Sequence, residues 1–172
     1  MFLNYIKNFF VKKTLKNSLQ NLKSNASTAA IHTVGLVVDA TDFVKIELLI
    51  KELSSFGIVP ESIKTIVYNG KLKKGNKDTY PTFNARHLNW NGQISSPAVH
   101  DFINQKFDLL ISYYDIEKAI LMQITHHSKA NFKVGFSTID KRLNHFMIKT
   151  EVNSYSVFVS ELFKYLKLLN KI

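Results

Sequence analysis

Three aspartates, Asp39, Asp42 and Asp115, lie at or just beyond the ends of short apolar segments and offer the most obvious chemistry in this sequence. Hard cations such as Mg²⁺ bind carboxylate oxygens, so three converging aspartates could form a magnesium site. Aspartates in such turns more often cap helices or stay solvated. We therefore predict no metal ion at these residues.

The histidine, serine and cysteine patterns argue against a hydrolase. His126 and His127 are adjacent, so on a helix their side chains point about 100° apart and do not share a metal. Gly135-Phe136-Ser137 lacks the second glycine of a Gly-x-Ser-x-Gly nucleophile elbow. The chain contains no cysteine, which excludes thiolate nucleophiles, thiolate metal sites and disulfides. These patterns favour a binding protein over an enzyme.

The turn after the first apolar segment carries no dinucleotide fingerprint. It reads Asp39-Ala40-Thr41-Asp42, where Gly-x-Gly-x-x-Gly would let the backbone approach a pyrophosphate. Carboxylates at this place repel phosphate, and the sequence has no Gly-x-x-x-x-Gly-Lys-Ser/Thr element for nucleoside triphosphates. We therefore predict no cofactor.

The 172-residue chain has a formal net charge of +10, which favours polyanionic partners such as RNA or an anionic membrane surface. Residues 1–38 contain no acidic residue. A second basic segment could bind anions through four lysines: Lys71, Lys73, Lys74 and Lys77. Only Arg86 and Arg142 are arginines, however, and recognition of phosphates and base edges favours the bidentate guanidinium. The lysine excess is equally consistent with a compositional bias of the source.

Residues 1–30 are predicted to form a basic helical arm and a linker. Two apolar stripes lie about 180° apart on this helix. They consist of Phe2, Leu3, Ile6, Phe9 and Phe10, and of Val11, Leu15, Leu19 and Leu22. One straight helix cannot bury both in one groove, so either it bends near residues 10–11 or its first part docks elsewhere. We favour a helix packed on the sheet, and the alternative is a helix that lies on an anionic membrane. No segment has the pattern of a signal peptide or a membrane span, so we expect a cytoplasmic protein.

Short apolar segments alternate with helical patterns along the rest of the chain. Segments 34–39, 107–114 and 132–137 are typical of strands covered on both faces, and 63–68 is predicted to be a further strand. Amphipathic patterns predict helices at 42–56, 97–103, 115–127 and 155–169. We also expect a short strand at 85–90, a turn at 90–92 and an edge strand at 146–152. The fold class is α/β: a single Rossmann-like, three-layer domain at residues 31–172 with a mostly parallel central sheet.

This fold predicts where a ligand would bind. In an open parallel sheet, ligands lie beyond the carboxyl ends of the strands, at the point where the strand order reverses. The residues expected at this rim are Asp39, Thr41, Asp42, Asn69, Tyr114, Asp115 and Ser137. They predict a location for a ligand but no reaction.

Four segments resemble a family of uncharacterised Bacteroidetes proteins of about this length: 33–39 (TVGLVVD), 107–114 (FDLLISYY), 132–136 (FKVGF) and 161–167 (ELFKYLK). The resemblance covers nearly the whole chain and implies a domain of unknown function. Residues 108–136 also resemble, more weakly, the N-terminal Rossmann-like half of heptosyltransferase-type glycosyltransferases. In those enzymes this half faces the acceptor and a second domain holds most of the nucleotide-sugar site. That likeness implies a chain without its donor-binding half.

Three functional hypotheses follow. The first is a non-catalytic α/β protein that binds a protein partner or a small ligand. The second is a basic accessory protein for RNA, ribosomes or an anionic membrane surface. The third is a degenerate glycosyltransferase-like enzyme, which would need a deep pocket at the rim beside Asp39 and Asp115.

Overall fold

The computed structural model describes residues 2–20, 30–70 and 79–172. Its strands form one six-stranded sheet in the order β3-β2-β1-β4-β5-β6, and every neighbouring pair is parallel. The strands are Val34–Asp39 (β1), Ile63–Tyr68 (β2), Thr82–Phe83 (β3), Leu109–Tyr113 (β4), Phe132–Phe136 (β5) and Phe146–Ile148 (β6). This topology confirms the predicted α/β class. The strand order reverses between β1 and β4, so the rim of interest lies beyond those two strands.

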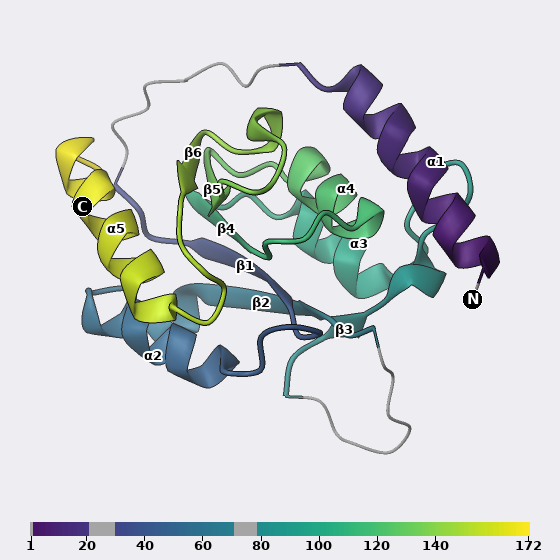
Figure 1. The fold of residues 1–172 in the computed structure, drawn as a ribbon. Coiled ribbons are helices and arrows are strands. Elements are labelled where there is room, and N and C mark those ends of the chain that lie inside the picture. The colour runs from purple at the N-terminus through teal and green to yellow at the C-terminus, as the bar shows by residue number, and fades with distance from the viewer. Residues whose placement is uncertain (1, 21–29, 71–78) are drawn as a thin grey trace.

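Helices cover both faces of the sheet (Figure 1). They are Phe2–Ser18 (α1), Ile46–Ser55 (α2), Pro97–Asn104 (α3), Ala119–His127 (α4) and Tyr155–Leu168 (α5). The α2 and α5 helices pack together on one face, whereas α3 and α4 lie on the other and α1 packs outside α4. Three short 3₁₀ turns span Pro60–Ser62, Ala85–His87 and Lys141–Leu143. The result is the predicted three-layer arrangement.

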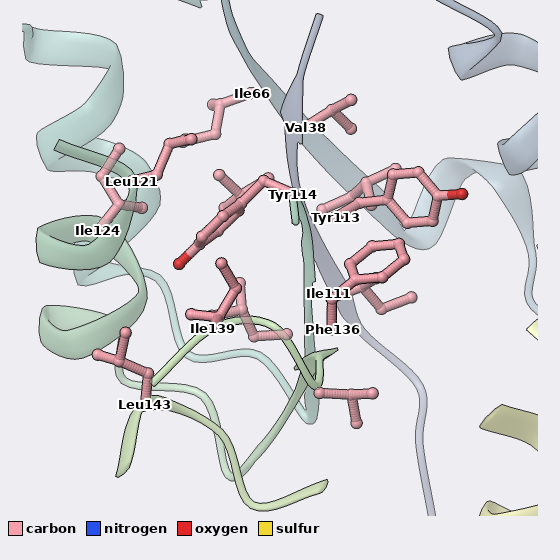
Figure 2. Close-up of a cluster of buried hydrophobic side chains, with 14 of the residues drawn as sticks. Val38, Ile66, Ile111, Tyr113, Tyr114, Leu121, Ile124, Phe136, Ile139 and Leu143 are labelled. Atoms are coloured by element: carbon pink, nitrogen blue, oxygen red, sulfur yellow. The ribbon is translucent and has the colours of Figure 1, made fainter. Parts of the chain in front are cut away.

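The central strands are buried because both of their faces meet a helix layer. Every residue of β1, β4 and β5 is buried, as expected for apolar runs without polar alternation. Successive side chains still point to opposite faces. Figure 2 shows this at the end of β4, where Tyr113 points away from α4 and Tyr114 points towards it. The Tyr113 hydroxyl donates to the Val152 carbonyl at 2.6 Å.

Several element boundaries differ from the sequence prediction. The α2 helix begins at Ile46 rather than at residue 42, and Lys45 occupies its N-cap position without a side-chain hydrogen bond. Residues 85–87 form a 3₁₀ turn instead of a strand, because the Asn84 side chain accepts a hydrogen bond from the Arg86 amide. The boundary between an arm at 1–30 and a domain at 31–172 falls beside residues 21–29, which lie outside the described residues, and stays a prediction.

The α1 helix is continuous and buries only one of its two apolar stripes. Val11, Leu15 and Leu19 are buried, and the helix packs mainly on α4 and the Ala85–His87 turn rather than directly on the sheet. The other side of α1 stays exposed through four large side chains: Leu3, Tyr5, Phe9 and Phe10. The helix therefore forms an outer wall of the α3–α4 layer.

Candidate functional site

Asp39 lies at the predicted rim, but a lysine covers it. The register pairs Asp39 at the end of β1 with Tyr68 at the end of β2. The Lys118 ammonium forms an ion pair with the Asp39 carboxylate and lies 4.8 Å from the centre of the Tyr68 ring. Burial, together with the negative charge of Asp39, raises the pKa of Tyr68. The carboxylate at the end of β1 is thus covered by its ion pair with Lys118.

Other predicted rim residues gather around this pair. The Thr41 amide donates to Asp39 Oδ1 at 3.0 Å, and the Asp42 carboxylate lies 3.9 Å from the Lys118 ammonium. Asn69 follows β2, and its amide donates to the Phe83 carbonyl at 2.9 Å. Thr41 and Asp42 are exposed, so the outer side of the cluster faces solvent. The structure therefore brings the β1 and β2 residues of the predicted rim together.

The β4 and β5 residues of the rim are arranged differently. Thr138 Oγ1 donates to the Asp115 carbonyl at 2.8 Å, and the Ser137 amide donates to the Ile148 carbonyl. Tyr114 is not a rim residue in the structure. It is fully buried under α4, and its hydroxyl lies 2.8 Å from Thr125 Oγ1. Tyr114 therefore belongs to the core of the α4 layer (Figure 2).

The loop between β4 and α4 joins the rim to α1. Glu117 forms an ion pair with Lys16 at 2.6 Å and lies 3.7 Å from Lys12, both on α1. Glu117 Oε1 also accepts a hydrogen bond from the Asp140 amide at 3.1 Å. Asn8 Oδ1 of α1 accepts from the Ala119 amide at 2.8 Å, which satisfies a free donor at the start of α4. These contacts explain why α4 begins at Ala119 rather than at Asp115.

The four lysines predicted to bind anions, Lys71, Lys73, Lys74 and Lys77, lie outside the described residues. Their proposed role stays a prediction.

A cavity of about 700 Å³ lies in the α3–α4 layer, away from the rim residues. Its walls come from α1, α3, α4 and the 89–95 segment. The lining residues are Thr14, Leu15, Ser18, Asn89, Asn91, Gly92, Gln93, Ile94, Ser95, His100, Ile103, Asn104, Gln123, His126 and His127. Known small-molecule pockets have volumes of roughly 300–1,000 Å³, so this cavity has the size of a ligand site.

Gln123 places a buried side-chain amide in the wall of the cavity. It belongs to α4 and is only 8% exposed. Its Oε1 atom is buried and has no hydrogen-bond partner within the described part of the chain. Gly92, with φ +82°, lies next to the amide, where a Cβ atom would come 3.1 Å from Gln123 Nε2. A buried amide oxygen without a donor costs about 1–3 kcal/mol, which a bound donor would offset.

Three histidines surround the same cavity. His127 Nδ1 bonds the Gln123 carbonyl at 2.9 Å, and His100 Nε2 bonds the Ile94 carbonyl. His126 packs edge-on against His127, with ring centres 4.9 Å apart. Burial lowers the pKa of His126, and the nearby His127 and Lys133 lower it further. The His126 ring is therefore held neutral over a wider range of pH.

The described cavity lining is polar but carries no aspartate, glutamate, lysine or arginine. It can hold an uncharged molecule through amide, hydroxyl and imidazole groups, with Leu15, Ile94 and Ile103 as apolar contacts. Sequence reasoning missed this site because its walls are separated by up to 113 positions, from Thr14 to His127. A signal in the sequence was the group of amides Asn89, Asn91 and Gln93, which is more than the predicted turn at 90–92 requires.

The described residues also bear on metal ions and membranes. Across residues 2–20, 30–70 and 79–172, no group of three or more His, Cys, Asp or Glu side chains could hold a metal ion. Within the same ranges, no helix combines the length and apolarity needed to cross a bilayer.

Comparisons with known proteins identify the family but no activity. No curated protein and no solved structure matches the chain. A family profile does match, over residues 7–169, and so covers most of α1, the whole sheet and α5. The match includes the walls of the cavity and the rim alike. The chain therefore belongs to the family of unknown function DUF6913.

Proposed function

We propose that the protein is a non-catalytic binding protein that holds a small uncharged ligand in the cavity between α1, α3 and α4. The observation that carries the proposal is Gln123, whose buried Oε1 has no donor within the described residues and which lines the cavity. Buried polar atoms in proteins are nearly always hydrogen-bonded. A ligand donor that reaches the Gln123 amide from the cavity would satisfy this one.

The size and charge of the cavity support the same proposal. About 700 Å³ accommodates a small metabolite, and the described lining offers polar contacts without a fixed charge. The rim remains a proposed second contact region, through Asp39, Thr41, Asp42, Asn69, Asp115 and Ser137. A glycosyltransferase-like reaction would need an open pocket beside Asp39, where Lys118 lies, so we do not propose it.

The proposal is tested by recovering a ligand from the full-length protein. Small molecules released by denaturing the purified wild type are compared, by mass spectrometry, with those released from Gln123→Leu. We expect a compound enriched on the wild type and lost from the variant, because leucine has a similar size but cannot accept a hydrogen bond. Gln105→Leu is the matched control, since Gln105 is exposed and does not line the cavity.

The same variants are examined by ligand-observed NMR with a library of uncharged fragments. Fragments that bind the wild type and Gln105→Leu but not Gln123→Leu support the cavity as the site. The proposal is overturned if no compound co-purifies and no fragment perturbs the amide signals of cavity residues.

A second candidate function is association with an anionic membrane surface through α1. The specific observation is the exposed apolar side of this helix, where Tyr5 is 72% exposed and Leu3 is 68% exposed. Phe9 and Phe10 extend the patch, and Lys13 is exposed beyond them. Aromatic and aliphatic side chains flanked by lysines are typical of helices that lie in the membrane interface. The sequence of α1 contains no acidic residue, although Lys7 is buried and Lys12 and Lys16 pair with Glu117.

A further inference from the structure

We propose that the ligand of the cavity is a neutral polyhydroxylated molecule, such as a monosaccharide or another polyol. This inference rests on the proposed function and specifies the chemistry of its ligand. The inference is drawn from the hydrogen bonds within the cavity lining. These bonds determine which donor and acceptor atoms are still available to a ligand.

The histidine tautomers are fixed by backbone carbonyls. A carbonyl oxygen can only accept, so His127 Nδ1 must carry the hydrogen that it donates to the Gln123 carbonyl. In the neutral ring, Nε2 of His127 is then an acceptor. By the same argument, His100 Nε2 donates to the Ile94 carbonyl, which leaves Nδ1 of His100 as an acceptor. Because both residues are exposed, each neutral imidazole thus keeps one acceptor nitrogen that a ligand hydroxyl or water can bond.

The hydroxyl groups and the buried amide add further acceptors. Ser18 Oγ donates to the Leu15 carbonyl at 2.8 Å, and Ser95 Oγ donates to the His87 carbonyl at 3.2 Å. Each serine already donates its only hydroxyl hydrogen, so its oxygen can act only as a hydrogen-bond acceptor for a ligand. Gln123 Oε1 is the fifth acceptor and the most deeply buried. A ligand with several hydrogen-bond donors would therefore match this set of acceptors.

Two asparagines supply donors to the same cavity. Asn91 Oδ1 accepts from the Gln93 amide at 3.1 Å, and Asn104 Oδ1 accepts from the Lys129 ammonium at 3.0 Å. In each side-chain amide the oxygen is therefore already bonded, and the NH₂ group remains available to donate to a ligand. A cavity that offers both acceptors and NH₂ donors matches a hydroxyl group, which donates and accepts at one atom.

Charge excludes the other donor-rich ligands. A polyamine has many donors, but the described lining has no carboxylate to balance its charge, and the chain carries a net +10. Inorganic phosphate at neutral pH has few P–OH donors and a negative charge, and it would face five acceptors without a lysine or arginine among the described lining residues. A neutral polyol has neither problem.

The first test examines the tautomers in the full-length protein without ligand. Two-bond ¹H–¹⁵N correlation NMR at neutral pH is expected to show His127 as the Nδ1–H tautomer and His100 as the Nε2–H tautomer. The opposite tautomer at His127 would remove a cavity acceptor and overturn the inference, whereas the proposed function would stand.

The second test compares ligand classes by titration of ¹⁵N-labelled protein. The probes are D-glucose, D-mannose and myo-inositol as neutral polyols, spermidine as a cation and inorganic phosphate as an anion. We expect at least one polyol to shift the amide signals of Gln123 and His127, with binding weakened about tenfold or more by Gln123→Leu and unchanged by Gln105→Leu.

The outcomes separate the inference from the proposed function. Uncharged fragments that bind the cavity while all three polyols fail would overturn the polyol assignment only. Tighter binding of spermidine or phosphate than of any polyol, lost in Gln123→Leu, would also overturn it. If no fragment and no probe shifts the cavity signals, both the inference and the proposed function fail.

Discussion

Lys133 is a buried cation that holds the end of α4. Lys133 is only 4% exposed. Its ammonium donates to the Thr125 carbonyl at 2.7 Å and to the His126 carbonyl at 3.1 Å. The last carbonyls of a helix lack partners within it, and a cation is favoured at this end. Desolvation nevertheless lowers the pKa of Lys133 from 10.5 to about 8. The folded state therefore binds this proton less tightly than the unfolded state does.

This shift predicts a pH dependence of stability. Because the folded pKa is the lower one, burial of Lys133 costs stability below pH 8, and the cost fades as the pH rises from about 8 to 10.5. The free energy of unfolding of the wild type should rise over this window relative to Lys133→Met. The shift corresponds to an upper value of roughly 3 kcal/mol. Urea unfolding of both proteins at several pH values measures the difference, and a constant difference would contradict the prediction.

The candidate sites show which residues a sequence can identify. Asp39 was predicted at the rim because it ends a buried run, and β1 ends there. Lys118, which neutralises it, is 79 positions away, and no local pattern marks their pairing. Tyr114 was predicted at the rim because it follows the central strand, but it is buried under α4, beside Thr125. Gln123 looked like an ordinary polar residue on the inner face of a helix.

At the scale of elements, strands were easier to predict than helix starts. The bounds of β1 and β2 agree with the prediction, because an apolar run ends where burial ends. The start of α4 is instead set by Asn8 and by the contacts of Glu117, which come from other elements. The conflict between the two stripes of α1 was visible in the sequence. Which stripe is buried depends on the surface that α4 presents, and the shape of that surface cannot be read from the sequence.

The exposed side of α1 predicts membrane binding. We expect the wild type to sediment with vesicles of phosphatidylglycerol and phosphatidylcholine, and the double variant Phe9→Ser, Phe10→Ser to stay in the supernatant, because the apolar contact is lost. Val157→Ser, Leu168→Ser is the matched control, since these exposed apolar residues lie on α5. Equal sedimentation of the two double variants would count against α1 as the contact. If the wild type sedimented equally well with vesicles of pure phosphatidylcholine, charge would not contribute to membrane binding.

For the whole molecule, Glu117 is the junction that holds α1 against the rest of the fold. Its carboxylate meets Lys12 and Lys16, and its side chain is only 17% exposed. Removing one partner of an ion pair that is shielded from water lowers the free energy of unfolding more than breaking a pair on the surface does. Since Thr14, Leu15 and Ser18 of α1 line the cavity, the junction also determines the shape of the proposed ligand site.

We predict that Glu117→Gln loosens α1. Hydrogen exchange of α1 amides should become faster, while that of β1 and β4 stays the same, and the free energy of unfolding should fall by about 1–2 kcal/mol. Glu161→Gln is the control, because Glu161 forms an exposed ion pair with Lys164 at 3.8 Å and should change stability by less than about 1 kcal/mol. Equal effects of the two variants would show that Glu117 does not anchor the helix.

The attachment of α1 also has a consequence for biosynthesis. A ribosome releases this helix before any of its partners, since Asn8 meets a residue 111 positions later and the Leu19 carbonyl accepts from Arg142, 123 positions later. This helix thus emerges well before the segments that hold it and is among the last to find its place. Until then Val11, Leu15 and Leu19 are without the neighbours that bury them, so a nascent chain exposes them to chaperones or lipid before the cavity exists.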